Sequence, residues 1–138
     1  MKNEIRTARA EMKYARMSAF KIRDIARAMR GLPVKEADAR LSFAPQKSAR
    51  LLLQTLRSAI ANGENNHSIP ADKLLVHEVM VGEGSTFHRF QPKARGSAGP
   101  IRKRTSHIRI TLKEMSEEEL NPVKKEKKGT KAKATSKA

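Results

Sequence analysis

The chain has 138 residues, the size of one domain, and its 30 Lys and Arg residues against 14 Asp and Glu give a formal net charge of +16. That charge favours a polyanionic partner, either a nucleic acid or an anionic membrane surface. The absence of cysteine excludes disulfides and thiolate metal sites. No apolar run approaches the roughly 20 residues that span a bilayer, and the first residues show no signal-peptide pattern.

The N-terminal residues alternate between apolar and charged side chains, which predicts a half-buried strand. Its expected apolar face consists of Ala8, Ala10, Met12 and Tyr14. Near Ser18 the period changes to that of a helix, with an inward stripe of Ile22, Ile25, Ala26 and Met29. Ser18 is the expected N-cap of this helix, and Gly31 is its expected C-terminal stop.

Two prolines divide the next part of the chain into two further helices. Pro33 opens a short helix over Val34–Phe43, and Pro45 suits the first turn of a third helix. The expected inward residues of the short helix are Ala37 and Leu41, and those of the third are Ala49, Leu52, Leu53, Leu56 and Ile60. Asn62-Gly63 is expected to end the third helix and begin a polar loop over residues 63–72.

Two more strands complete the predicted body. Leu74–Val81 is rich in Leu and Val and predicts a mostly buried strand, whereas Ile108, Ile110 and Leu112 alternate with polar residues. If the two strands pair antiparallel, the segment between them becomes an extended hairpin arm, about residues 84–106, that reaches about 30 Å from the body.

The predicted fold class is α+β, with a small three-stranded antiparallel sheet packed on three helices and the long β-hairpin arm. Residues 1–113 are expected to form a single domain that includes the arm. Residues 114–138 read as an acidic patch followed by a Lys-rich tail, which is expected to be disordered because it has too little apolar surface to offset chain entropy.

The arm segment is distinctive because no acidic residue lies between Glu83 and Glu114. Its cations are Arg89, Lys93, Arg95, Arg102, Lys103, Arg104, Arg109 and Lys113. Charge of one sign on a segment with little core repels itself unless a polyanion surrounds it, and nucleic acid phosphate is the commonest such partner. The alternative reading is a disordered basic loop. With no Trp, one Tyr and four Phe in the chain, contacts are expected to use mainly phosphate, sugar and shape.

No constellation of residues predicts catalysis, a metal or a cofactor. The four histidines, at positions 67, 77, 88 and 107, lack metal-ligand spacing and a neighbouring carboxylate pair. Ser106 and His107 fall on opposite faces of a strand, which is poor geometry for a nucleophile and its base. Gly82-Glu83-Gly84 is not followed by the Lys-Ser/Thr of a phosphate loop and fits a strand bend better.

Two further groups of cations precede the arm. The first group lies where the first strand meets the first helix, and the second lies in an acid-free window over residues 39–63. They are Lys13, Arg16, Lys21 and Arg23, and then Arg40, Lys47, Arg50 and Arg57. Each alone fits an ordinary solvated surface, but together they favour a phosphate-binding surface. Ser18, at the first group, either caps the helix or reaches phosphate.

Several strings resemble the family of large-subunit ribosomal protein twenty-two, the L-twenty-two family. They are ARMSAFKIR at residues 15–23, SAIAN at 58–62, KARG at 93–96 and RKRTSHI at 102–108. Their order and spacing match over residues 5–113. The family commonly has more basic residues where this chain has His88, Phe90, Gln91 and Ser97, so the contacts of the arm tip are the part that the resemblance defines least.

The resemblance implies a structural constituent of the large ribosomal subunit that bridges rRNA domains during assembly and has no catalytic activity. It implies that the hairpin tip lines the polypeptide exit tunnel near the macrolide site. The expected partners are large-subunit rRNA, neighbouring ribosomal proteins and the nascent polypeptide, with no membrane. The expected rRNA-binding residues are Lys13, Arg16, Ser18, Lys21, Arg23, Lys47, Arg50, Arg89, Lys93, Arg95, Gly96, Arg102, Lys103, Arg104, Thr105, Ser106 and His107. The expected tunnel-lining residues are Phe87, His88, Arg89 and Phe90.

Two other functions stay open at the level of sequence. A nucleoid-type architectural DNA-binding protein would also carry a basic β-arm, with a proline near its tip that can enter a minor groove, and would usually dimerise. An RNA-processing enzyme is disfavoured by the missing acid–base residues. The lack of a presequence favours the bacterial cytoplasm, and an organellar ribosome stays open.

Overall fold

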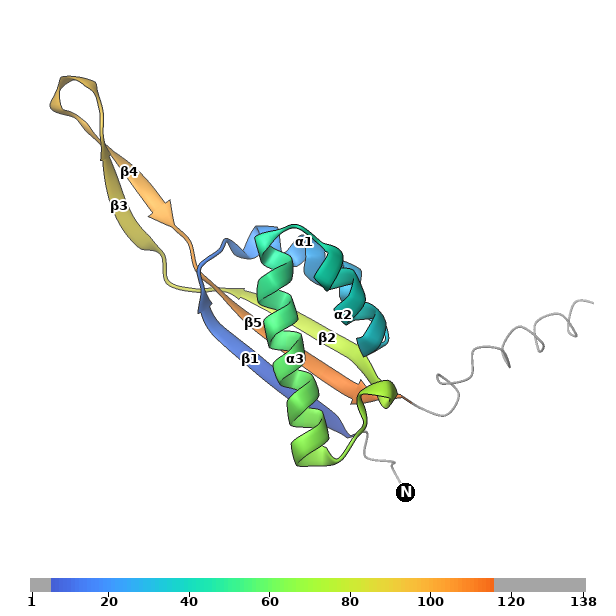
Figure 1. The fold of residues 1–138 in the computed structure, drawn as a ribbon. Coiled ribbons are helices and arrows are strands. Elements are labelled where there is room, and N and C mark those ends of the chain that lie inside the picture. The colour runs from blue at the N-terminus through green and yellow to red at the C-terminus, as the bar shows by residue number, and fades with distance from the viewer. Residues whose placement is uncertain (1–5, 116–138) are drawn as a thin grey trace, which may run out of the picture.

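A computed structural model describes residues 6–115, which form a three-stranded sheet covered on one face by helices, with a two-stranded arm extending from one end (Figure 1). The sheet has the order β1 (Thr7–Ala15), β5 (Ser106–Glu114), β2 (Leu74–Glu83), and both pairings are antiparallel. The predicted α+β fold is confirmed. The predicted Lys-rich tail lies outside the described residues.

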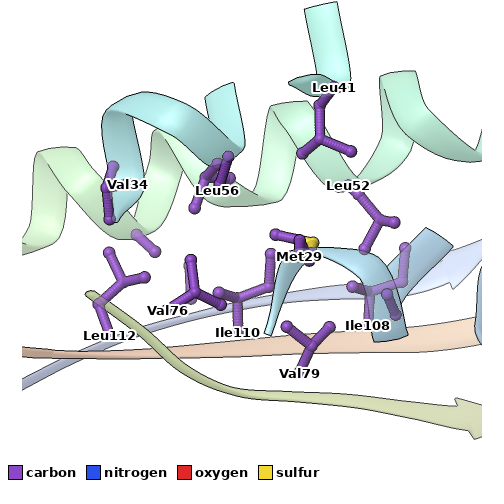
Figure 2. Packing of buried hydrophobic residues seen from close by; sticks show 14 of the residues in the cluster. Met29, Val34, Leu41, Leu52, Leu56, Val76, Val79, Ile108, Ile110 and Leu112 are labelled. Carbon is purple, nitrogen blue, oxygen red and sulfur yellow. The ribbon is translucent and has the colours of Figure 1, made fainter. Parts of the chain in front are cut away.

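The three helices are α1 (Ala19–Met29), α2 (Val34–Phe43) and α3 (Lys47–His67). They share one core with the inner face of the sheet, where large aliphatic side chains from all layers meet (Figure 2). The central strand β5 supplies Ile108, Ile110 and Leu112, all fully buried, because alternate residues of a strand point to the same face. These three residues were expected to be buried from their alternation alone.

The predicted apolar face of the first strand is wrong at Tyr14. The pairing of β1 with β5 shifts between Met12 and Ala15, where a β-bulge turns the chain. Tyr14 has a φ of 54° and is 59% exposed, while Ala15 takes the buried position. The Tyr14 N–H donates to His107 Nδ1 at 3.2 Å, and the two rings meet edge to face, which holds the bulge in place.

A second bulge explains which residues of β2 are buried. Val76 and Val79 are three residues apart yet both are fully buried, because the register against β5 shifts between Val76 and Glu78. The extra residue, His77, is exposed. The strand is therefore buried on one face only and forms one edge of the sheet.

The predicted end of the third helix at Asn62-Gly63 is also wrong. α3 continues to His67 and ends at Ser68, which adopts the left-handed conformation and donates its N–H to Glu64 O. Gly63 is buried within the helix, where an added Cβ would lie 3.1 Å from Leu74 Cδ1 and 3.4 Å from Ala8 Cβ. Glycine therefore lets the helix approach the sheet, and the predicted polar loop is shorter and contains the buried Ile69.

The other helix ends and the margin of the core differ from the sequence prediction only in detail. Gly31 does follow the end of α1, with a φ of 76° and an N–H that donates to Val76 O at 2.8 Å. Pro45 was expected inside the first turn of α3 but precedes the helix, whose N-cap is Gln46. Leu53 and Ile60 lie at the margin of the core and are only partly buried.

The arm consists of β3 (Phe87–Pro92) and β4 (Ala98–Lys103), joined by a turn over residues 93–97. Phe87 pairs with Lys103 and Pro92 with Ala98, so the predicted antiparallel hairpin is present. Every residue of β3 is exposed, and Gly99 is the buried residue of β4. Each strand has six residues and spans about 20 Å.

Candidate nucleic-acid interface

The arm leaves the body at a tightly packed joint between β2 and β5. Gly84 donates its N–H to Thr105 O at 3.0 Å, and Thr105 Oγ1 donates to Ser85 O at 2.6 Å. Thr105 is 2% exposed, and a Cβ on Gly84 would lie 2.5 Å from its Oγ1. A side chain at position 84 would therefore collide with Thr105. The two hydrogen bonds tie the two strands of the hairpin together where they meet the sheet.

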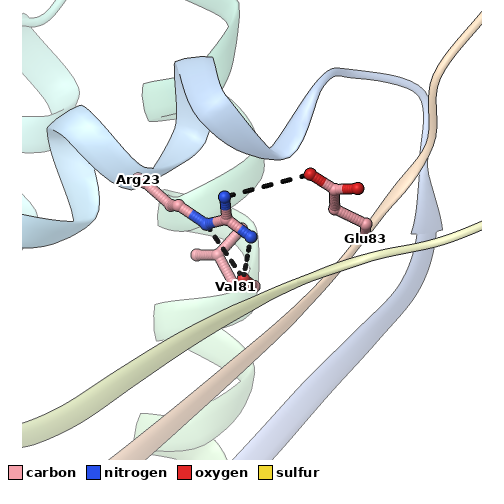
Figure 3. A network of polar contacts seen from close by, with 3 residues as sticks. All are labelled: Arg23, Val81 and Glu83. Atoms are coloured by element: carbon pink, nitrogen blue, oxygen red, sulfur yellow. Dashed lines mark hydrogen bonds and ion pairs between the residues drawn. The ribbon is translucent and has the colours of Figure 1, made fainter.

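Arg23 reinforces this joint from α1 (Figure 3). Its Nε and Nη2 donate to Val81 O at 3.3 and 3.2 Å, and its Nη1 lies 3.9 Å from Glu83 Oε1. A guanidinium that binds a backbone carbonyl and a carboxylate holds α1 against the last residues of β2. The side chain is 42% exposed, so part of the group still faces solvent.

A basic pocket lies beside the joint, where the β1–α1 loop faces the first residues of the arm. Its volume is about 420 Å³. The lining comprises Arg16, Ser18, Phe87, Arg89, Arg102, Lys103, Arg104 and Thr105. We call it the arm-root pocket. The guanidinium carbon of Arg16 lies 5.9 Å from the centre of the Phe87 ring, a cation–π contact that joins the body to the arm.

The electrostatics of the arm-root pocket differ from those of the body. Five of its eight lining residues are cationic and none is acidic, and within residues 6–115 none of the five forms an ion pair with a carboxylate. Some body cations are paired with carboxylates, for example Arg40 with Glu36 at 2.6 Å and Arg109 with Glu11 at 3.3 Å. Asp38 raises the pKa of Arg57 above its ordinary value through a hydrogen bond and its negative charge. The arm-root pocket therefore gathers five cations without a carboxylate partner at one place on the surface.

The turn of the arm forms a second basic site at the far end of the hairpin (Figure 1). Arg95 and Gly96 both adopt positive φ angles, 58° and 70°, which lets the chain reverse within five residues. The Lys93 side chain lies over Gly99, where an added Cβ would meet its Cε at 2.5 Å. Gly99 thus leaves room for the Lys93 side chain to lie across the hairpin.

The part of the chain that the structure describes shows no metal-binding group of three or more His, Asp or Glu side chains. Within the same residues, no helix is both long and apolar enough to cross a membrane. The main chemical feature of this part of the surface is therefore the group of unpaired cations that line the arm-root pocket.

Comparison with known proteins identifies the family. The model of the family described as ribosomal protein L22p/L17e matches residues 10–113, which include the helices, the whole arm and most of the sheet. The chain belongs to this family.

Relatives within the L22p/L17e family match most of the chain. The large ribosomal subunit protein uL22 of Methylacidiphilum infernorum is 56% identical over 106 residues, which cover 77% of this chain and 93% of that protein. The uL22 protein of Akkermansia muciniphila is 54% identical over 104 residues, 75% of this chain and 93% of its own. That of Pediococcus pentosaceus is 42% identical over 117 residues, 85% of this chain and 99% of its own.

The structure brings together seven of the residues expected to bind rRNA. Arg16, Ser18, Arg89, Arg102, Lys103, Arg104 and Thr105 line the arm-root pocket. Lys93, Arg95 and Gly96 lie together at the turn, about 20 Å further along the arm. Lys13, Lys21 and Arg50 are exposed on three different elements of the body and join neither site.

Other expected contact residues have protein partners or are buried. Lys47 Nζ donates to Arg16 O at 3.4 Å and so supports the loop that carries Arg16. His107 accepts the Tyr14 N–H. Ser106 is completely buried, so in this conformation its hydroxyl is not available to RNA. The available signal was the alternation of β5, because Ser106 lies two residues before Ile108 and therefore on the same buried face.

The expected tunnel-lining residues Phe87, His88, Arg89 and Phe90 do not lie at the tip of the hairpin, where they were expected. They form the first part of β3, and Phe87 pairs with Lys103 beside the joint. Gly82 and Glu83 pair with His107 and Ser106, and the hairpin then continues over six paired residues on each strand before it turns. The farthest residues are those of the turn, 93–97.

The ring of Phe87 was not expected in the basic pocket. Sequence reasoning placed it at the tip of the arm and assigned Arg16 to a separate cluster on the body. The available signal was the position of Phe87 only three residues after Gly84, which keeps it close to the body.

Proposed function

We propose that the protein is a structural constituent of the large ribosomal subunit that binds large-subunit rRNA through its arm and the arm-root pocket. The observation that carries this proposal is the family match over residues 10–113, combined with the unpaired cations of the matched arm. The relatives are themselves named as large ribosomal subunit proteins. The function is architectural, without catalysis, and the relatives favour a bacterial ribosome.

RNA would stabilise the arm in two ways. Phosphate groups neutralise side chains that otherwise repel one another, and RNA surrounds strands that have no core of their own. The outer face of the sheet is less suited to this task, because its Glu11 already neutralises Arg109. Rigid attachment of the arm at the Gly84–Thr105 joint would let one protein contact rRNA segments that lie far apart, which supports a bridging role in assembly.

The distal turn is the part of the arm that we assign to the polypeptide exit tunnel. Residues 93–97 project farthest from the body, and their side chains are exposed. Neighbouring ribosomal proteins would contact the body, and the nascent chain would pass the turn. Phe90, whose ring is 74% exposed, lies on β3 between the two sites and is part of neither.

Sedimentation of ribosomal particles tests this function. The full-length protein should travel with large subunits through a high-salt wash, and a variant in which residues 93–97 are replaced by Asn-Gly should still do so. In particles that contain this variant, nascent-chain stalling or macrolide sensitivity should change. A protein that sediments free of large subunits would overturn the proposed function. Unchanged tunnel behaviour in assembled particles would overturn the tunnel assignment alone.

A further inference from the structure

We propose that the arm-root pocket binds one unstacked RNA base together with its phosphate. This inference rests on the proposed rRNA-binding function and adds a ligand class to one site within it. The pocket has a volume of about 420 Å³, within the range of about 300–1,000 Å³ that small-molecule sites occupy. The space is therefore too large to be a packing defect and is large enough for a nucleotide.

The first argument concerns the aromatic ring. Phe87 is 42% exposed in the described structure, although it lies beside the body and not at the end of the arm. An exposed aromatic ring gains little from water, and in RNA-binding proteins such rings stack on unpaired bases. The Arg16 guanidinium over the ring adds a second flat group of the kind on which bases also stack.

The second argument concerns the charge around that ring. Arg89, Arg102, Lys103 and Arg104 line the same pocket as Arg16, and no carboxylate lines it. A purely apolar ligand would leave these cations uncompensated, and a free anion would leave the ring unused. A nucleotide supplies both a planar apolar base and a phosphate.

The third argument favours an unpaired base, and not a base pair within a duplex, as the ligand of the pocket. In an A-form duplex the bases are stacked on one another, and the protein reaches mainly phosphate and sugar. Phosphate contacts alone require no ring in a pocket. The Ser18 hydroxyl also lines the pocket and makes no capping hydrogen bond to α1, so it can donate to phosphate or to a base edge.

Phe90 provides a matched control on the same strand. It lies three residues after Phe87, so its side chain points to the opposite face of the hairpin, and it does not line the pocket. It is more exposed than Phe87, 74% against 42%. Loss of general hydrophobic contact would therefore affect Phe90→Leu at least as much as Phe87→Leu, whereas loss of a specific stack would affect only the latter.

The test uses the full-length protein and two RNA probes. One is a short single strand with one 2-aminopurine base, whose fluorescence is quenched on stacking, and the other is a duplex with the same number of phosphates. Phe87→Leu should weaken single-strand binding by about 5- to 150-fold, the range for one base–aromatic stack, and should abolish the quenching. Phe87→Tyr should restore both, and Phe90→Leu should change neither. Duplex binding should be unchanged in all three variants.

Three results would overturn the proposal: Phe87→Leu binds the single strand like the wild type, it weakens both probes equally, or Phe90→Leu has the same effect. If Phe87→Leu does not fold, ultraviolet cross-linking of the wild-type complex tests the proposal instead. The probe base should then cross-link to residues of the arm-root pocket, and cross-linking elsewhere would contradict the proposal. Entry of the wild-type protein into large subunits is independent of these outcomes. Failure of the base site is thus distinguishable from failure of the ribosomal function.

Discussion

Single residues determine how the arm is joined to the body. Gly82 and Gly84 lie two residues apart at the end of β2, and neither requires a positive φ. Their surroundings differ, because a Cβ on Gly84 would collide with Thr105 across the joint, while a Cβ on Gly82 would have room. The requirement for glycine at position 84 is therefore steric and not conformational.

Gly84→Ala should destabilise the protein by about 1–3 kcal/mol, the usual cost of overpacking. The new Cβ would lie 2.5 Å from Thr105 Oγ1 and 3.1 Å from His107 Nε2. Thr105 cannot move away cheaply, since it is β-branched, buried and hydrogen-bonded to Ser85 O. The measurement is the free energy of unfolding in urea.

Gly82→Ala is the matched control, because its added Cβ meets nothing nearer than His107 Cβ at 4.0 Å. It should leave the free energy of unfolding nearly unchanged. Equal destabilisation by the two substitutions would show that the joint is not sterically constrained.

The residues that sequence analysis misplaced share a physical cause. Tyr14 and His77 lie at β-bulges, which interrupt alternation without any local sequence signal in this chain. Gly63 has the usual appearance of a helix stop, yet it lies inside α3 because Leu74 and Ala8 occupy the space that a side chain would need. In each case the deciding contact comes from an element distant in sequence, which a local pattern does not contain.

At the level of elements, the periodicity of the sequence was sufficient to predict core residues wherever one face of the element is buried. The alternation in β5 and the helical stripe of α3 predicted the core residues Ile108, Ile110, Leu52 and Leu56, and all four are fully buried. The existence of the arm was predictable from the two strands that flank it, because their antiparallel pairing makes the segment between them a hairpin. The arm-root pocket was not, because it joins Arg16 to Phe87, 71 positions apart in the chain.

Because α3 packs against the core with one face, substitutions of its leucines should destabilise the protein to different degrees, according to how deeply each side chain is buried. Leu56→Ala should destabilise the protein by about 2–5 kcal/mol, because Leu56 is fully buried and its removal leaves a cavity. Leu53→Ala removes the same atoms from a partly buried position and should have a clearly smaller effect. Urea unfolding of both variants measures the difference, and similar losses would place Leu53 in the core as well.

The arm should be far less protected from amide exchange than the sheet when RNA is absent. All six residues of β3 are exposed, and a two-stranded hairpin without a packed face is marginally stable in water. In the free protein, amides of residues 87–103 should exchange fast while that of Ile110 stays protected. Addition of rRNA should slow exchange in the arm. Strong protection of the arm without RNA would show that the hairpin is stable by itself.

Across the residues that the structure describes, several cations of the body are paired with carboxylates, whereas those that line the arm-root pocket are not. Body cations such as Lys35, Arg40 and Arg57 form ion pairs, with Asp72, Glu36 and Asp38 respectively. Within residues 6–115, the cations at the arm root have no such carboxylate partners. Net charge alone indicated a polyanionic partner, and only the structure shows which cations are free to bind it.

Replacement of Arg102, Lys103 and Arg104 by Ala should therefore flatten the salt dependence of rRNA binding. Each lost phosphate contact lowers the slope of log affinity against log salt by about 0.7–0.9, so loss of all three contacts lowers it by about 2–3. The control replaces Lys35, Arg40 and Arg57 by Ala, which removes the same formal charge from paired positions. Because those cations are already neutralised, the control should keep the wild-type slope. An equal reduction in both triple variants would mean that RNA senses only the net charge of the protein. A wild-type slope with weaker binding in the first variant would instead indicate non-ionic recognition at the arm root, and either result would contradict a phosphate-binding role for these three residues.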